Sequence, residues 1–356
     1  MTVSFAYSLE RVGVLMERDI DDPREAWGVL NPASARSREG DLLLFPRLVA
    51  EGNVSRVGVA RVLFSDAGVP TGVQRLGVAL EPDEPWERNA HTSGVEDPRI
   101  TFVEDLDVHV MTYCAYGPLG PRIALAVSVD LDKWQRLGPV TFSYAPALRA
   151  DLNLYPNKDA LLFPSAVPGP DGKPCVAMLH RPMWDLSWVR EGERTLLPEG
   201  LDDERNGIWV SYVPLARAVA DLSELTRMSG HRCVALPEQP WEALKIGGGT
   251  PPVRTDAGWL TLHHGVAGRL VKGTDLQPHV HYSAGVMVHA PEDVGRLLYR
   301  SPSPLLEPEV VEEREGIVPN VVFPTALEMV SEDTGWVFYG MADSRIGVAR
   351  LTISAS

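Results

Sequence analysis

Short apolar segments separated by turn residues recur along the whole chain, and this pattern constrains the fold more than any other feature. Most of them span about 5–10 residues and are rich in Val, Ile, Tyr, Phe and Trp, which favour β-strands. Gly and Pro contribute 31 and 30 of the 356 residues, which indicates many turns. We therefore expect a mostly β protein, with strands at residues 41–50, 56–64, 106–116, 122–129, 175–180, 207–213, 258–264, 280–288, 335–341 and 345–353.

Helical segments are predicted at two places only. Residues 219–228 (VADLSELTRM) follow a strand-like segment, and residues 291–297 could form a short turn of helix. These two segments are too short to change the all-β class.

Several strand segments repeat one another. The sequence Arg-x-Gly-x-Ala begins at Arg56 and again at Arg345, with a looser copy at Arg122, and Leu-Phe-Pro or Val-Phe-Pro occurs at 44–46, 162–164 and 322–324. Such spacing favours a β-propeller of about four or five blades with about four strands each. A two-sheet sandwich is the alternative. Copies near both ends favour a ring closed by the two termini, and hence a single domain over residues 1–356.

The charge of the chain excludes some classes of partner. Its formal net charge is −15, which repels nucleic-acid phosphates and anionic membrane surfaces. We therefore expect no nucleic-acid partner, although a local basic pocket could still hold a small anion. No apolar run approaches the roughly 18 residues of a membrane-spanning helix, and no signal peptide is evident.

The cysteine pattern predicts reduced thiols. Cys114, Cys175 and Cys233 are far apart and odd in number, so neither a disulfide framework nor a zinc site is indicated. We expect a cytoplasmic protein on this basis.

The segment at residues 94–101 (GVEDPRIT) combines two carboxylates with a proline and an arginine. Pro98 biases Asp97 away from the α region, toward extended or turn backbone. In a regular strand Glu96 and Asp97 would point to opposite faces, and Arg99 would lie on the side of Asp97. The segment is then expected to supply one acid and not an acid/base pair. A solvated turn is the alternative.

Three further segments carry polar groups that could form a site. Residues 157–164 (NKDALLFP) and 179–182 (LHRP) place polar side chains at strand ends, with two polar loops as the alternative. Lys245 precedes three glycines, which let backbone approach a ligand closely, and could meet a phosphate; a surface turn is the alternative. His263 and His264 should face opposite ways on a strand, so that at most one serves a given site. We expect no metal site, because further ligands are not evident.

Taken together, these segments resemble glycoside hydrolase family 130, the family of inverting β-mannoside phosphorylases with some β-mannosidases among its members. The resemblance implies a five-bladed β-propeller. It spans most of the chain and is carried by the segments at 31–33 (NPA), 94–100, 157–164, 179–182, 245–252 (KIGGGTPP), 259–266, 321–324 (VVFP) and 340–343 (GMAD), together with Arg56.

The resemblance also implies roles for particular residues. Asp97 corresponds to the general acid. Phosphate carries roughly −1.5 to −2 charges at neutral pH, and three residues of this chain match the family's basic phosphate-binding positions. The phosphate-binding candidates are Arg181, Lys245 and His264, and the substrate-binding candidates are Asn31, Arg56, Glu96, Arg99, Asp159 and Asp343.

The predicted reaction is inverting phosphorolysis of a β-mannosidic bond of a manno-oligosaccharide, giving α-D-mannose 1-phosphate and a shortened sugar. Phosphate is the co-substrate and no other cofactor is expected. An inverting β-mannosidase is the first alternative. Such a hydrolase needs a second carboxylate as base to activate water, and Glu242 is a candidate for that base. A non-catalytic sugar-binding propeller is the second. Linkage, acceptor and homo-oligomer formation are left open, and the polar segment 185–206 could rim the acceptor site.

Overall fold

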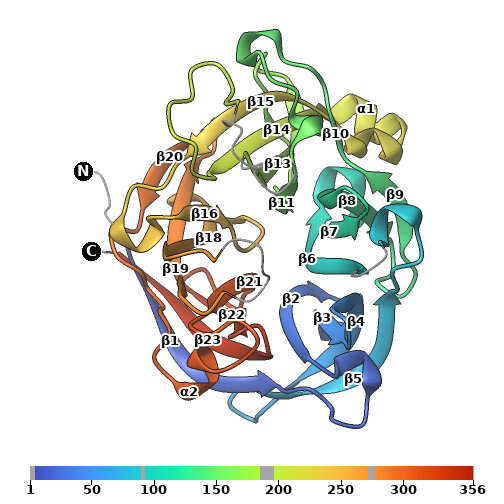
Figure 1. The fold of residues 1–356 in the computed structure, drawn as a ribbon, viewed down its shortest axis with the longest axis vertical. Coiled ribbons are helices and arrows are strands. Elements are labelled where there is room, and N and C mark those ends of the chain that lie inside the picture. The colour runs from blue at the N-terminus through green and yellow to red at the C-terminus, as the bar shows by residue number, and fades with distance from the viewer. Residues whose placement is uncertain (1–4, 90–92, 185–195, 272–276, 356) are drawn as a thin grey trace.

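The computed structural model describes residues 5–89, 93–184, 196–271 and 277–355, which form a five-bladed β-propeller (Figure 1). The blades surround a central axis, and each contributes its first strand to the lining of that axis. The five innermost strands are β2 (Gly28–Arg36), β6 (Ser93–Val103), β11 (Asn157–Leu162), β16 (Lys245–Gly248) and β21 (Val322–Met329).

The remaining strands build outward from these five in antiparallel order. The first blade continues with β3 (Leu42–Ala50), β4 (Val54–Phe64) and β5 (Pro70–Leu80), and the second with β7 (Val108–Gly117), β8 (Gly120–Ser128) and β9 (Gln135–Pro139). The third contains β13 (Pro174–Pro182), β14 (Ile208–Pro214) and β15 (Arg227–Ala235), with the short β10 (Thr141–Phe142) and β12 (Val167–Pro168). The fourth contains β17 (Val253–Thr255), β18 (Gly258–Gly268), β19 (Val280–Ala290) and β20 (Asp293–Arg300).

The fifth blade closes the ring with strands from both ends of the described chain. It consists of β21, β22 (Thr334–Met341), β23 (Arg345–Ala355) and β1 (Phe5–Met16). Strand β1 pairs antiparallel with β23 from Phe5↔Ala355 to Met16↔Ile346. A strand from one end of the chain therefore completes a sheet begun by the other, as the sequence predicts. That the whole chain forms a single domain stays a prediction.

The sequence repeat marks one position in the blade. Arg56, Arg122 and Arg345 lie in β4, β8 and β23, which are the third strands of the first, second and fifth blades. The Phe-Pro copies do not share a position, because one lies in the second strand β3 and the others in or beside first strands. The Arg-x-Gly-x-Ala repeat thus follows the architecture, whereas the Phe-Pro repeat does not.

Five hydrophobic clusters hold the blades together. Each draws its buried side chains mainly from two neighbouring blades, such as Val110 and Met178 between the second and third, or Leu260 and Val337 between the fourth and fifth. Burial on both faces explains why strands such as β8 are almost continuously apolar. The other clusters include Phe45, Leu161 and Phe338.

Both helical predictions were wrong in detail. The helix predicted at 219–228 is replaced by α1 (Leu215–Ala220), the 3-10 turn η6 (Leu222–Thr226) and the start of β15. Asp221 interrupts the helix in extended backbone (φ −155°), and its side chain caps η6 by accepting a hydrogen bond from Ser223 N. Residues 291–297 are not helical, because β20 begins at Asp293 and pairs with β19.

A buried glutamate precedes the innermost strand in four of the blades, a repeat that the sequence analysis missed. Each lies in a short helix: η1 (Pro23–Glu25), η2 (Pro85–Glu87), η7 (Pro240–Glu242) and α2 (Val311–Arg314). The carboxylate accepts a hydrogen bond from a backbone N–H three to six residues earlier in the chain and pairs with an arginine of the outermost strand. The pairs are Glu25 with Arg75, Glu87 with Arg136, Glu242 with Arg300 and Glu313 with Arg11.

The third blade replaces this glutamate with an uncharged chain of hydrogen bonds. Asn157, His180, Ser211 and His231 contribute one side chain from each of its four main strands. Burial and the nearby His231 hold the pKa of His180 well below its ordinary value, so the chain is neutral. Short 3-10 turns complete the described structure at η3 (Glu104–Leu106), η4 (Pro146–Leu148) and η5 (Leu152–Leu154). Within the described residues, no helix is long and apolar enough to cross a membrane.

Candidate active site

Polar side chains converge at one end of the central axis because the innermost strands are interrupted there. Asn31, Asp97 and Asp159 lie in β2, β6 and β11 with φ of 43°, 47° and 54°, each at a shift in strand register. Asp343, in the turn between β22 and β23, has φ 51°. Positive φ at residues other than glycine is uncommon and costs free energy. Four predicted site residues share this backbone strain, which is typical of functional sites.

Asp97 lies at the centre of an ion-pair network. Its Oδ1 accepts hydrogen bonds from Asn31 Nδ2 (2.9 Å) and Arg47 Nη1 (3.2 Å). Arg47 Nη2 also donates to Glu96 Oε1 (2.9 Å), and Lys158 Nζ lies 3.4 Å from Glu96 Oε2. Glu96 and Asp97 therefore contact the same guanidinium.

The expectation that Glu96 and Asp97 face opposite ways was wrong. It assumed a regular strand, but the register shifts between Glu96 and Arg99 and the backbone of Asp97 is left-handed. Such a bulge redirects side chains. The two carboxylates remain unequal in role, because Glu96 is bound by both Arg47 and Lys158.

The two aspartates of this network have pKa values shifted in opposite directions. Burial acts to raise the pKa of Asp97, but the charges of Arg47, Lys158 and Arg99 hold it below the ordinary value. Burial and the charge of Asp97 raise the pKa of Asp343 to about 6. Neighbouring carboxyls with separated pKa values suit proton transfer near neutral pH.

A second, basic group of side chains surrounds Asp159. Arg181 Nε donates to Asp159 Oδ2 (2.6 Å), and His264 Nε2 lies 3.7 Å from the same oxygen. Lys245 Nζ lies 5.4 Å from the ring centroid of Tyr282, which is also stacked on His264 at 5.8 Å. The three predicted phosphate ligands thus lie near one another, with Asp159 among them.

Burial lowers the pKa of His264 to about 3, and the charges of Arg181, Lys245 and Arg99 act in the same direction while Asp159 opposes them. The imidazole is therefore neutral at physiological pH. It can donate one hydrogen bond without adding a further buried charge.

Several buried polar atoms of this group have no hydrogen-bond partner within the described residues. They are Arg99 Nη2, Arg181 Nη1 and His264 Nδ1, on side chains that are almost fully buried. Most buried polar groups are paired, so each exception calls for an explanation. Two of the three belong to guanidinium groups, which always donate. The arrangement therefore fits a small anion with several acceptor oxygens.

Arg99 joins the two groups. It donates from Nε to Gly249 O and from Nη1 to Asp97 O (2.8 Å), and its guanidinium lies 5.4 Å from the centroid of Phe323. The glycine run is required nearby, because a Cβ at Gly247 would lie 2.3 Å from Asp159 Oδ2 and 2.4 Å from His264 Cε1.

Arg56 makes its described ion pair outside the Asp97 network, and its role in substrate binding stays a prediction. Its Nε pairs with Glu81 Oε2 at 2.8 Å, and Arg47 holds the position beside Asp97. Arg47 and Lys158 were missed. A signal was present for Arg47, which is a lone charge within an otherwise apolar strand segment, LLLFPRLVA. Lys158 lies in a segment already singled out, directly before Asp159.

Glu242, the candidate base for hydrolysis, is part of the repeated blade structure. Its side chain is fully buried, its Oε1 lies 2.9 Å from His263 Nε2, and Arg300 pairs with its Oε2. Burial acts to raise its pKa, but the hydrogen bond from His263 and the charges nearby lower it to about 2. His263 and His264 do face opposite ways, as predicted. Glu242 therefore supports the blade and has no access to a substrate.

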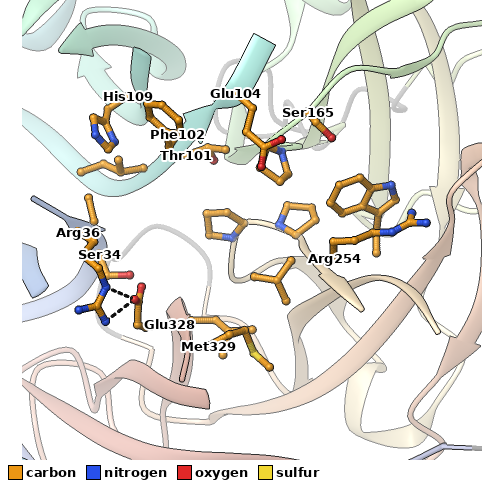
Figure 2. A pocket seen from close by; sticks show the side chains of 18 of the residues that line it. Ser34, Arg36, Thr101, Phe102, Glu104, His109, Ser165, Arg254, Glu328 and Met329 are labelled. Atoms are coloured by element: carbon orange, nitrogen blue, oxygen red, sulfur yellow. Dashed lines mark hydrogen bonds and ion pairs between the residues drawn. The ribbon is translucent and has the colours of Figure 1, made fainter. Parts of the chain in front are cut away.

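A cavity lies at the other end of the axis (Figure 2). Its volume is about 1070 Å³, and its lining includes Ser34, Thr101 and Glu328 from the ends of innermost strands and Arg254 from β17. Arg36 pairs with Glu328 at one side of it (Figure 2). None of the predicted site residues is among its described lining. The volume of this cavity therefore does not identify the site, because the carboxylate group and the basic group lie at the opposite end of the axis.

The structure covers part of the long polar segment at 185–206. Residues 185–195 lie outside the described residues. The described part packs on the third blade, where Tyr155 Oη donates to Leu196 O (2.8 Å) and Glu199 N to Leu148 O (2.6 Å). Among the described residues, no group of three or more His, Cys, Asp or Glu side chains could hold a metal ion.

Comparison with known proteins decides the family. A family model described as beta-1,4-mannooligosaccharide phosphorylase matches residues 8–185 and 225–355, which is more than half of the chain. The chain belongs to glycoside hydrolase family 130. It is therefore an enzyme, as the resemblance to this family predicts.

Relatives and solved structures agree with membership of family 130. The 1,2-beta-oligomannan phosphorylase of Thermoanaerobacter sp. (strain X514) is 31% identical over 293 residues, covering 78% of this chain and 79% of the relative. The Beta-1,4-mannooligosaccharide phosphorylase of Ruminococcus albus is 27% identical over 294 residues, covering 82% and 72%. The crystallised Beta-1,2-Mannobiose phosphorylase from Listeria innocua, at 21% identity, has a TM-score of 0.69 and covers 97% of this chain and 96% of that one. That likeness supports the propeller fold.

Proposed function

We propose that this enzyme is an inverting β-mannoside phosphorylase, which cleaves a manno-oligosaccharide with inorganic phosphate to give α-D-mannose 1-phosphate and a shortened sugar. The observation that carries the proposal is the set of buried nitrogen atoms on Arg99, Arg181 and His264 that have no hydrogen-bond partner within the described residues. With Lys245 they form an anion site that is joined through Arg99 to Asp97.

In the proposed reaction, the mannosyl unit lies between the two groups. Asn31, Asp97 and Asp343 contact this sugar, and phosphate lies against the basic group. The C1–O glycosidic bond breaks as a phosphate oxygen bonds to C1 from the opposite face. The leaving oxygen takes a proton from Asp97, directly or through a sugar hydroxyl. Hydrogen phosphate loses its proton as its oxygen bonds to C1, and this proton restores the acid form of Asp97, so that no proton is gained or lost overall.

The low pKa of Asp97 is that of the empty site. A bound sugar excludes water, and desolvation raises the pKa of a carboxyl. Asp343, with its pKa already near 6, can share the proton, and the two carboxyls then titrate as a pair. The site can therefore hold one proton between them when substrate is bound.

Hydrolysis is the second candidate and has less support. An inverting hydrolase needs a base to activate water. Glu242 is buried within the fourth blade. Burial acts to raise the pKa of Asp159, but the charges of Arg181 and Arg99 hold it below the ordinary value, which makes Asp159 a weak base. Phosphate needs no such base, because it is already an anion.

The relatives suggest which linkage to test first. Two relatives of at least 30% identity over three quarters of the chain are both named for 1,2-linked mannosides, and one of 27% identity for 1,4-linked ones. We propose β-1,2-manno-oligosaccharides as the preferred substrates. A cytoplasmic location and assembly into a homo-oligomer stay predictions.

The test is to incubate the enzyme with β-1,2- and β-1,4-manno-oligosaccharides, with and without phosphate, and follow products by ³¹P and ¹H NMR. We expect α-mannose 1-phosphate only when phosphate is present. Release of mannose at the same rate without phosphate would support the hydrolase. Binding of the sugars without turnover in either buffer would support a non-catalytic sugar-binding propeller.

A further inference from the structure

A second cavity lies beside the candidate active site, between the fifth and first blades. Its volume is about 510 Å³, within the roughly 300–1,000 Å³ of ligand pockets. Its described lining consists of Glu17, Arg18, Trp27, Gly316, Ile317, Ser344 and Arg345.

This cavity is attached to the catalytic end of the propeller. Ser344 directly follows Asp343, and its carbonyl accepts a hydrogen bond from Val29 N (3.2 Å) at the start of β2. Trp27 immediately precedes β2 and lies four residues before Asn31, or about 13 Å along an extended strand. Two of the proposed sugar contacts, Asn31 and Asp343, therefore lie within four residues in the chain of Trp27 and Ser344, which line the cavity.

The walls are fixed by hydrogen bonds. Ser344 Oγ accepts from Ile317 N (3.0 Å) and donates to Ala342 O (3.1 Å). Arg18 Nη1 donates to Ala26 O beside Trp27, and Trp27 N donates to Val49 O (2.9 Å). The described walls of the cavity are thus held in place by hydrogen bonds.

The chemistry of the lining matches a neutral sugar. Trp27 is 41% exposed although it is a large aromatic residue, and the negative face of its ring complements the C–H groups of a pyranose. Arg18, Arg345 and Glu17 add donors and acceptors for hydroxyl groups. Glu17 lies 3.7 Å from Arg345, which offsets part of the charge and disfavours a pure anion site.

We propose that this cavity is a distal subsite, in which Trp27 binds a sugar unit of a manno-oligosaccharide whose cleaved unit lies at Asp97. The inference rests on the proposed function and adds a preference for the length of the oligosaccharide substrate. The enzyme then prefers oligosaccharides that reach from Asp343 past Ser344 to Trp27, and a disaccharide does not use the subsite.

The experiment compares kcat/KM for phosphorolysis of β-1,2-linked mannobiose, mannotriose and mannotetraose by the full enzyme and by its Trp27→Ala variant. We expect the unmodified enzyme to favour the longer substrates. In Trp27→Ala that preference should fall by about tenfold, equivalent to about 1.4 kcal/mol, while mannobiose is cleaved as before. Trp27→Phe should retain most of the preference.

Phe102→Ala is the matched control, because Phe102 is 42% exposed but lines the cavity at the other end of the axis. It should leave the chain-length preference unchanged. The proposal is overturned if Trp27→Ala slows all substrates equally or none of them, or if the unmodified enzyme shows no preference for length.

Failure of the proposed function would show separately, as absence of α-mannose 1-phosphate from every substrate. In that case, titration calorimetry with mannotetraose still tests the subsite. Equal affinity of the unmodified protein and Trp27→Ala would overturn it, and a loss of about tenfold in the variant would support it.

Discussion

At the scale of single residues, the site depends on charges that are held in place by other charges. Arg47 binds both Glu96 and Asp97, while Arg181 binds Asp159. Three carboxylates of the site, those of Glu96, Asp97 and Asp159, therefore each have a basic partner. Variants of these residues therefore fall into two kinds: those that remove a group that reacts with the substrate, and those that change the charges around it.

Asp97→Asn tests the proposed acid. The amide keeps the shape and can still accept from Asn31 and Arg47, but it cannot deliver a proton. We expect kcat to fall by about 10²–10⁴-fold, the usual contribution of general acid catalysis, with the melting temperature changed little. Steady-state assays and a thermal melt check this. Activity above a tenth of normal would exclude Asp97 as the acid.

Arg181 should affect phosphate more than sugar. In Arg181→Lys one charge still faces Asp159, but the planar fork and its unpartnered Nη1 are lost. We expect KM for phosphate to rise by about 10–100-fold, from about 1.5–3 kcal/mol per hydrogen bond to a charged group, while KM for the sugar changes little. Arg227→Lys, at an exposed ion pair with Glu224, is the control. An equal rise in both KM values would contradict the assignment.

Asp343 predicts a pH dependence of stability. Its pKa is raised to about 6 in the folded protein from an ordinary value of 3.8, so the folded state binds the proton more tightly than the unfolded state. This contribution is complete below about pH 4 and is lost as the pH rises through 6. Asp343→Asn should therefore increase the free energy of unfolding at pH 7.5 by about 1–2 kcal/mol, with a smaller gain at pH 4.5. Urea unfolding at both pH values measures this, and an equal gain at both would contradict the raised pKa.

At the scale of elements, interrupted strands and short helices form the site. The register shifts of β2, β6 and β11 turn the side chains of Asn31, Asp97 and Asp159 toward the site. The glutamate-bearing helices fix where β2, β6, β16 and β21 begin. Lys245 follows Glu242 by three residues, so the position of a proposed phosphate ligand depends on a blade element.

Glu242→Gln separates the structural role from the role of a base. Weakening a buried ion pair costs about 3–5 kcal/mol, and we expect a loss of stability near the lower end because the amide keeps part of the hydrogen bonding. The activity of the folded protein should stay within about tenfold, below the 10²-fold minimum typical of a catalytic base. Glu87→Gln, in the equivalent position of the second blade, is the control. A larger loss of activity in Glu242→Gln alone would indicate a catalytic role.

At the scale of the whole molecule, stability depends on closing the ring. Strand β1 supplies Tyr7 to the cluster between the fourth and fifth blades, and Leu15 and Met16 to the cluster between the fifth and first. An unpaired β23 would expose a long apolar edge, which is prone to aggregate. The fifth blade and both adjoining interfaces therefore depend on residues 5–16.

Deletion of residues 1–16 should abolish cooperative unfolding and activity. A synthetic peptide of residues 1–16 added during refolding should restore both, because β23 offers the full register of β1. Circular dichroism melts and the phosphorolysis assay are the measurements. A deletion variant that stays folded and active without the peptide would show that closure of the ring is dispensable.

The sequence by itself determined the strands, the third-strand repeat and the segments that carry Asp97, Asp159, Arg181, Lys245 and His264, because composition and spacing are local properties. Only the tertiary structure decided that Arg47 and not Arg56 lies beside Asp97. It also decided that Glu96 and Asp97 face one guanidinium and that Glu242 is structural. These outcomes depend on strand register and on pairs far apart in the chain, such as Glu242 with Arg300. The free energy that fixes these contacts comes from the packing of five blades against one another. The residue pattern of a single strand does not reveal which strands pair or in which register.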